Sequence, residues 1–276
     1  MSLRFCSIAS GSSGNSYLVR TDSTALVVDA GISASRVVEG LVRAYTNPDE
    51  VNALLITHEH SDHIGGARAV MNRLDGASVF ASHGTFEGAA NGGASGRGPR
   101  FLVSEGRKEG FAPGESFTIG DIEVLSVPLS HDSTAPVGYV FTSSAGEGSV
   151  SIITDTGVFT DEMASATADA DVFVIEANHD VGMLVRGRYP DFLKQRVLSD
   201  HGHLSNEAAA DAVLRVVALE RKARCVLLAH LSAENNTPEI AERTVKGLLA
   251  EDEYHSGRDC YVGVLRRDRM SMVFEV

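Results

Sequence analysis

The feature that most constrains this chain is the motif THEHSDH, which directly follows the apolar residues ALLI. It places His58, His60, Asp62 and His63 within six positions at the end of a strand expected over 53–58. Residues two apart in an extended segment face the same way, so His58 and His60 can hold one ion. Asp62 and His63 begin the next helix and face a neighbouring point. The motif therefore offers two incomplete metal sites, which other parts of the fold must complete.

Further candidate ligands stand where other predicted strands end. His131 follows SVPLS, Asp155 ends VSIITD, and His230 ends RCVLLA. An aspartate between two ions can bridge them when they lie about 3.5–4 Å apart. The spacing of the first motif and these distant partners together favour one metal centre over histidines scattered on the surface.

Short apolar runs alternate with turns and helical patterns along the whole chain, and many runs are continuously apolar, as in strands buried on both faces. The expected strands cover 4–9, 16–20, 24–30, 53–58, 77–82, 122–129, 137–143, 150–155, 171–176 and 224–230, with two more in CYVGVL and MSMVFEV. Capped helical patterns cover 33–45, 206–223 and 237–253. Because no linker divides the 276 residues, we predict a single α/β domain over 1–276.

Composition limits the classes of partner that we expect for the chain. No apolar run approaches the ~20 residues of a membrane helix, and the start lacks a signal-peptide core, so we expect a cytoplasmic protein without a membrane partner. Cys6, Cys225 and Cys260 are expected to be reduced core thiols. The net charge of −13 argues against a broad basic face for nucleic acid, but not against a phosphodiester held by metal ions and a local basic patch.

Five motifs in this order resemble those of the metallo-β-lactamase superfamily: Asp29 in VVDAG, THEHSDH, SHD at 130–132, ITDTG at 153–157 and LLAH at 227–230. The resemblance spans nearly the whole chain. It implies a four-layer αββα sandwich, with the site along one edge of two sheets, and two divalent ions, zinc or manganese.

The same resemblance implies which residues bind each ion. For one ion the ligands are His58, His60, His131 and Asp155. For the other ion they are Asp62, His63, Asp155 and His230. Asp29 is expected to orient ligands or water without binding an ion itself. Glu59 points the other way by alternation and is not a predicted ligand.

Four further segments closely resemble the WalJ/YycJ/VicX family, whose members are bacterial stand-alone proteins related to RNase Z and to β-CASP nucleases. They are SIASGSSGNSYLV (7–19), EANHD (176–180), LSDHGHLSN (198–206) and LLAHLSAENNTPEIA (227–241). This resemblance implies a metal-dependent phosphodiesterase or nuclease, with DNA exonuclease activity. The interval between Asp155 and His230 is too short for a β-CASP domain, so we expect no such insertion. The long arm of RNase Z is also missing between His131 and Asp155, which argues against tRNA maturation.

Glu176 and His203 match a glutamate and a histidine of RNase Z motifs. A histidine held by a carboxylate is a suitable general acid for an alkoxide leaving group. Our hypothesis is that hydroxide generated by the metal ions attacks phosphorus while Asp62 or Asp155 accepts a proton. His203, oriented by Glu176, would protonate or stabilise the leaving oxygen.

Several residues are weaker candidates for substrate contacts. Asn15 lies in a Gly/Ser turn that can offer N–H groups to a phosphate, although a plain hairpin turn is an equal alternative. His179 can line the cleft, and the adjacent Asp180 can instead cap a helix. Arg186 and Arg188 are local phosphate-contact candidates.

Four other basic residues are further candidates for phosphate contacts: Lys194, Arg196, Arg97 and Arg100. Solvated surface charge is the competing interpretation for each of these, and for Arg186 and Arg188.

Two other functions stay open. The same metal core supports hydrolysis of a small ester, such as a lactone, thioester or cyclic phosphodiester. A regulatory protein that binds metal without turnover is the other alternative. The sequence does not distinguish manganese from zinc or DNA from RNA. It also leaves strand polarity, exonuclease against endonuclease action, and oligomeric state open.

Overall fold

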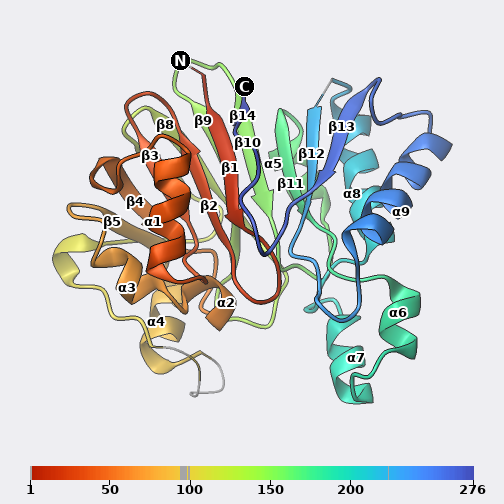
Figure 1. Cartoon of the computed structure of the whole chain (residues 1–276), viewed down its shortest axis with the longest axis horizontal. Coiled ribbons are helices and arrows are strands. Elements are labelled where there is room, and N and C mark those ends of the chain that lie inside the picture. Colours follow the sequence, from red (N-terminus) through yellow and green to blue (C-terminus); the bar gives the residue numbers. More distant parts are fainter. Residues whose placement is uncertain (1, 94–97, 99, 223) are drawn as a thin grey trace.

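The computed structural model describes residues 2–93, 98, 100–222 and 224–276. Two seven-stranded sheets pack face to face, and helices cover the outer face of each sheet (Figure 1). This arrangement confirms the predicted four-layer αββα sandwich. Within the described residues, no helix is long and apolar enough to cross a membrane.

The first sheet is built mainly from the N-terminal half of the chain. In spatial order its strands are β14 (Phe274–Glu275), β1 (Arg4–Ala9), β2 (Ser16–Arg20), β3 (Ala25–Val28), β4 (Val51–Leu55), β5 (Ser78–Ser82) and β6 (Lys108–Phe111). The strands from β3 to β6 are parallel to one another. The C-terminal strand β14 closes this sheet against β1, so both ends of the chain lie on the same side of the molecule (Figure 1).

The second sheet comes from the C-terminal half. In spatial order its strands are β13 (Cys260–Val264), β12 (Arg224–Ala229), β11 (Val172–Glu176), β10 (Ser149–Ile153), β9 (Val137–Ser143), β8 (Ile122–Pro128) and β7 (Ser116–Ile119). The strands from β10 to β13 are parallel, whereas β7, β8 and β9 form antiparallel pairs.

Helices from each half of the chain follow the strands they cover. The first half contains α1 (Ala34–Arg43), α2 (Ser61–Ile64), α3 (Ala67–Met71) and α4 (His83–Asn91), with a 3₁₀ turn at Pro48–Glu50 and another at Glu105–Arg107. The second half contains α5 (Asp161–Thr167), α6 (Val181–Arg186), α7 (Asp191–Val197), α8 (Asn206–Leu219) and α9 (Pro238–Glu251).

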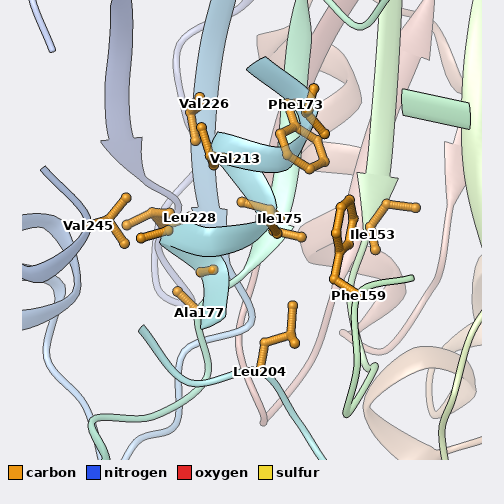
Figure 2. Close-up of a cluster of buried hydrophobic side chains, with 14 of the residues drawn as sticks. Ile153, Phe159, Phe173, Ile175, Ala177, Leu204, Val213, Val226, Leu228 and Val245 are labelled. Atoms are coloured by element: carbon orange, nitrogen blue, oxygen red, sulfur yellow. The ribbon is translucent and has the colours of Figure 1, made fainter. Parts of the chain in front are cut away.

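Side-chain alternation along the strands divides the interior into three apolar clusters. On β11, Val172 and Val174 face the other sheet, whereas Phe173 and Ile175 face the helices. Figure 2 shows Phe173 and Ile175 among residues of the helix-facing cluster, including Val213 of α8. Burial on both faces explains why these strands read as continuous apolar runs.

Some elements differ from the predicted ones. β6 and β7 were not expected, because most of their residues are not buried and they lack an apolar run. They are the last strands of the two sheets, where one edge pairs with no other strand of the described residues. The strand expected in MSMVFEV is shorter than predicted and covers only Phe274–Glu275, since only this part pairs with β1.

Candidate metal centre

The centre forms at the edge where the parallel strands of both sheets end. Asp29 follows β3, Asp155 follows β10, and His230 follows β12. These three residues have φ angles of 60°, 62° and 54°. Non-glycine residues rarely adopt this left-handed conformation, and such strain is concentrated at functional sites.

One ligand cluster consists of His58, His60 and His131, whose candidate ligand atoms lie within 4.8 Å of one another. The Nδ1 atom of His58 lies 3.1 Å from the Thr57 hydroxyl. The Nδ1 atom of His131 lies 3.1 Å from the Gly202 carbonyl. These contacts fix each ring and leave its Nε2 atom facing the cluster, as in many metal-binding histidines.

A second cluster consists of Asp62, His63, Asp155 and His230. The Nε2 atom of His63 lies 3.2 Å from Asp155 Oδ2 and 3.6 Å from Asp62 Oδ2. The Nε2 atom of His230 lies 3.2 Å from Asp62 Oδ2 and 3.4 Å from Asp155 Oδ1. Asp155 also reaches toward the first cluster, with its Oδ1 atom 3.9 Å from His131 Nε2.

Asp29 supports the second cluster from behind. Its Oδ2 atom lies 2.7 Å from His63 Nδ1, on the side of the ring away from the other ligands. It also accepts hydrogen bonds from the backbone N–H and the hydroxyl of Thr57. Asp29 is fully buried and can set the orientation of His63 without reaching an ion itself.

The donor set fits divalent cations. In the part of the chain that the structure describes, His58 Nε2 and Asp155 Oδ2 are buried and have no hydrogen-bond partner. Buried polar atoms normally have a hydrogen-bond partner. The two unpaired atoms therefore indicate that a further group binds between them and the neighbouring side chains. Imidazole nitrogens and carboxylate oxygens together suit zinc or manganese.

The electrostatics of the centre also favour a cation. Burial lowers the pKa of His230, but the Asp155 carboxylate and hydrogen bonds to Asp62 and Glu176 raise it more, to about 10. The pKa of His63 is raised well above its ordinary value for similar reasons, chiefly by Asp155 and Asp29 against the effect of burial. The carboxylates thus attract positive charge, which bound divalent ions would supply in place of protons.

Glu176 and His203 lie directly beside the second cluster. Glu176 Oε1 is 2.8 Å from Nδ1 of both His203 and His230, and Glu176 Oε2 accepts the backbone N–H of Thr156. Burial raises the pKa of Glu176, but His203 and the hydrogen bonds lower it to about 2. The carboxylate is therefore ionised and orients a ligand histidine as well as His203.

His203 is more exposed than His230, the ligand histidine that Glu176 also holds. Its side chain is 18% exposed, whereas that of His230 is 2% exposed. Burial opposes charge on His203, but the charge of Glu176 and its hydrogen bond raise the pKa of His203 above its ordinary value. Glu176 holds its Nδ1 atom, which leaves Nε2 as the atom that can donate a proton to a bound molecule.

The weaker candidates lie in different surroundings. Asn15 is buried, and its Nδ2 atom lies 3.1 Å from His63 Nε2, while its Oδ1 atom accepts the N–H of Gly11. His179 is buried outside both ligand clusters, and its ring nitrogens have no partner among the described residues. Asp180 caps α6 through a hydrogen bond from Met183 N.

The basic candidates are mostly on the surface. Arg186 and Arg188 are exposed at the end of α6 and just beyond it. Arg196 is exposed as well, but it forms an ion pair with Asp132. Arg97 lies outside the described residues.

Three supporting residues were not selected from the sequence, although each stands in a motif that was quoted. Thr57 contacts Asp29, His58 and His63. Asn178 donates to the carbonyl of His230. Asp132 lies 3.4 Å from His131 Nε2 through its Oδ1 atom. Each of the three stands next to a predicted site residue in the sequence, and this adjacency could have identified it.

Glu59, inside the first motif, points away from the ligands. Its Oε1 atom accepts hydrogen bonds from the backbone N–H and the hydroxyl of Thr134. It thereby ties the motif to the loop that carries His131.

Comparisons with known proteins identify the family of the chain. A family model described as "Beta-lactamase superfamily domain" matches residues 24–230. "Exodeoxyribonuclease WalJ" of Streptococcus pneumoniae serotype 2 is 40% identical over 256 residues, which cover 93% of this chain and 91% of that protein. "Exodeoxyribonuclease YycJ" of Bacillus anthracis is 40% identical over 260 residues, which cover 93% of each protein.

Among solved structures, the metallo-β-lactamase fold protein YhfI from Bacillus subtilis superposes with a TM-score of 0.72 at 17% identity, covering 100% of both chains. This likeness concerns the fold, whereas the 40% identity to WalJ and YycJ extends over nearly the whole sequence. The chain therefore belongs to the metallo-β-lactamase superfamily and, within it, to the family of WalJ and YycJ.

Proposed function

We propose that this protein is a metal-dependent hydrolase of phosphodiester bonds, and specifically a DNA exonuclease that uses two divalent ions, zinc or manganese. The observation that carries the proposal is the Glu176–His203 pair beside two adjacent ligand clusters. A lactam or thioester has less need of such a proton donor, whereas the alkoxide that leaves a DNA phosphodiester requires protonation. The relatives named as exodeoxyribonucleases support DNA as the substrate.

In this proposal His58, His60 and His131 would hold one ion, Asp62, His63 and His230 would hold the other, and Asp155 would serve both. When bound, the ions act as Lewis acids and lower the pKa of water toward neutrality. Asp62 or Asp155 would accept the proton that the attacking water loses. Asn15 and His179 remain proposed substrate contacts, with Arg186 and Arg188 as contacts to phosphates.

The leaving group is handled by His203. Glu176 holds its Nδ1 atom, so Nε2 faces outward and carries the proton to be donated. The leaving 3′ or 5′ oxygen takes this proton as the P–O bond breaks. We further propose that the chain acts as a single domain without a β-CASP insertion, and that it works in the cytoplasm, where its three free cysteines would stay reduced.

End-labelled DNA and RNA, single- and double-stranded, test the proposal in the presence of manganese. We expect metal-dependent shortening of DNA from one end by the wild-type protein and no cleavage by His58→Ala, which lacks a ligand. The product ladder gives polarity and mode of action. Full metal loading without cleavage of any strand would overturn the proposal. In that case, turnover of lactones or thioesters would identify a small-ester hydrolase, and its absence would favour a regulatory metal-binding protein.

A further inference from the structure

The segment between Glu176 and His203 leaves the sheet edge and returns to it. Its residues 181–202, here called the helical arm, contain α6 and α7 and project beyond the ends of β10, β11 and β12 (Figure 1). Hydrogen bonds hold both ends of the arm. Asp180 caps α6 at the start, and His203 N donates to Val197 O at the end.

Side-chain contacts fix the arm relative to the metal ligands. Arg196 of α7 is paired with Asp132, whose other carboxylate oxygen lies 3.4 Å from His131 Nε2. Lys194 of α7 donates to the carbonyl of Val185 in α6 at 2.8 Å, which joins the two helices. The arm is therefore a fixed extension of the site rather than a detached loop.

The charge of the arm differs from that of the rest of the chain. The arm carries four basic and two acidic residues, whereas the whole chain has a net charge of −13. Arg186 and Arg188 are exposed, and neither is paired with a carboxylate in the described residues. A basic surface next to the metal centre attracts a polyanion, while the acidic remainder repels it.

The arm also exposes large apolar side chains. Phe192 is 73% exposed, and Val185 and Leu198 are 54% and 48% exposed. Several large apolar side chains exposed on one short segment indicate an interaction surface. Aromatic side chains between basic residues are typical of proteins that bind unpaired nucleic-acid strands, because every base offers a flat face for stacking.

We propose that the helical arm binds the unpaired end of the DNA strand that enters the metal centre. Phe192 stacks on a base, and Arg186 and Arg188 contact the phosphates on either side. The inference rests on the proposed function and deepens it, since it names single-stranded DNA as the form that is held. The unpaired arginines favour this occupant over a second copy of the acidic chain.

Binding of two nuclease-resistant phosphorothioate strands, measured by fluorescence anisotropy, tests the arm. One strand carries bases, and in the other the bases are replaced by abasic sites. Phe192→Ala is expected to weaken binding of the first strand about tenfold or more and to leave the affinity for the second unchanged. Arg188→Ala is expected to weaken both and to reduce the salt dependence of log K by about 0.7.

Tyr45→Ala serves as the matched control, because Tyr45 is 92% exposed just beyond α1, on the other half of the molecule. It should bind both strands like the wild type. The melting temperature of Phe192→Ala should also match that of the wild type, since Phe192 is exposed. If the wild-type protein binds and cleaves DNA and Phe192→Ala binds it with the same affinity, the role proposed for the arm is wrong, but the proposed function stands.

The remaining outcomes are also decisive. If Phe192→Ala lowers the molecular mass in solution but not the DNA affinity, the arm is an interface between copies, and the proposal is wrong. A wild-type protein that neither binds nor cleaves DNA would overturn the proposed function, and the role of the arm with it.

Discussion

Replacing Asp155 with asparagine is expected to lower DNA hydrolysis by at least about 10³-fold, equivalent to about 4 kcal/mol of transition-state stabilisation. Asp155 is the carboxylate that contacts His63 and His230 and also reaches toward His131. Its buried Oδ2 atom has no hydrogen-bond partner among the described residues. The amide keeps the shape of the side chain but removes the negative charge that faces both ligand clusters. Initial rates on labelled DNA and bound metal per chain measure the effect.

Asp211→Asn is the matched control for this variant. Asp211 is exposed on α8, and the same change of charge there should leave both the rate and the metal content as in the wild type. Activity of Asp155→Asn within about tenfold of the wild type would show that Asp155 does not join the two ligand clusters.

The second large effect is expected for His203→Ala, which should slow DNA cleavage by about 10²–10⁴-fold without loss of metal. His203 contacts Glu176 through Nδ1 and belongs to neither of the two ligand clusters proposed to bind the ions. Its removal therefore takes away the proton donor and leaves the ligands in place. Rates on DNA and bound metal per chain are measured on the same preparation.

The nature of the leaving group distinguishes a proton donor from a structural residue. In a phosphodiester of p-nitrophenol, the p-nitrophenolate group leaves without protonation. His203→Ala should therefore slow hydrolysis of this substrate much less than hydrolysis of DNA. His201→Ala is the control, because His201 is exposed two positions away and its Nδ1 atom lies 3.1 Å from the Ser130 hydroxyl. Metal lost in step with activity would instead make His203 a ligand.

The central strands could be predicted from the sequence because burial on both faces makes them continuous apolar runs. β1 (Arg4–Ala9) and β9 (Val137–Ser143) have the predicted bounds. β6 and β7 could not be predicted in this way, since partial exposure removes the apolar signal. The short helices α6 and α7 also lack a long amphipathic pattern.

The candidate ligands could be proposed from the sequence because each one closely follows a strand whose end lies at the same edge. Spacing within a motif indicates that His58 and His60 act together, but it does not reveal hydrogen bonds between distant segments. That Glu176 holds His230 as well as His203 depends on how β11 and β12 pair. The link from Asp132 to Arg196 likewise depends on where the arm returns to the sheet edge.

The most direct test of the account is a titration of metal-free protein with manganese or zinc, in which bound ions per chain and the rate of DNA shortening are followed together. We expect exonuclease activity to rise with occupancy of the second ion and to reach its maximum at two ions per chain. Full activity with one ion would contradict the dinuclear centre. Two bound ions without any DNA hydrolysis would contradict the proposed function itself.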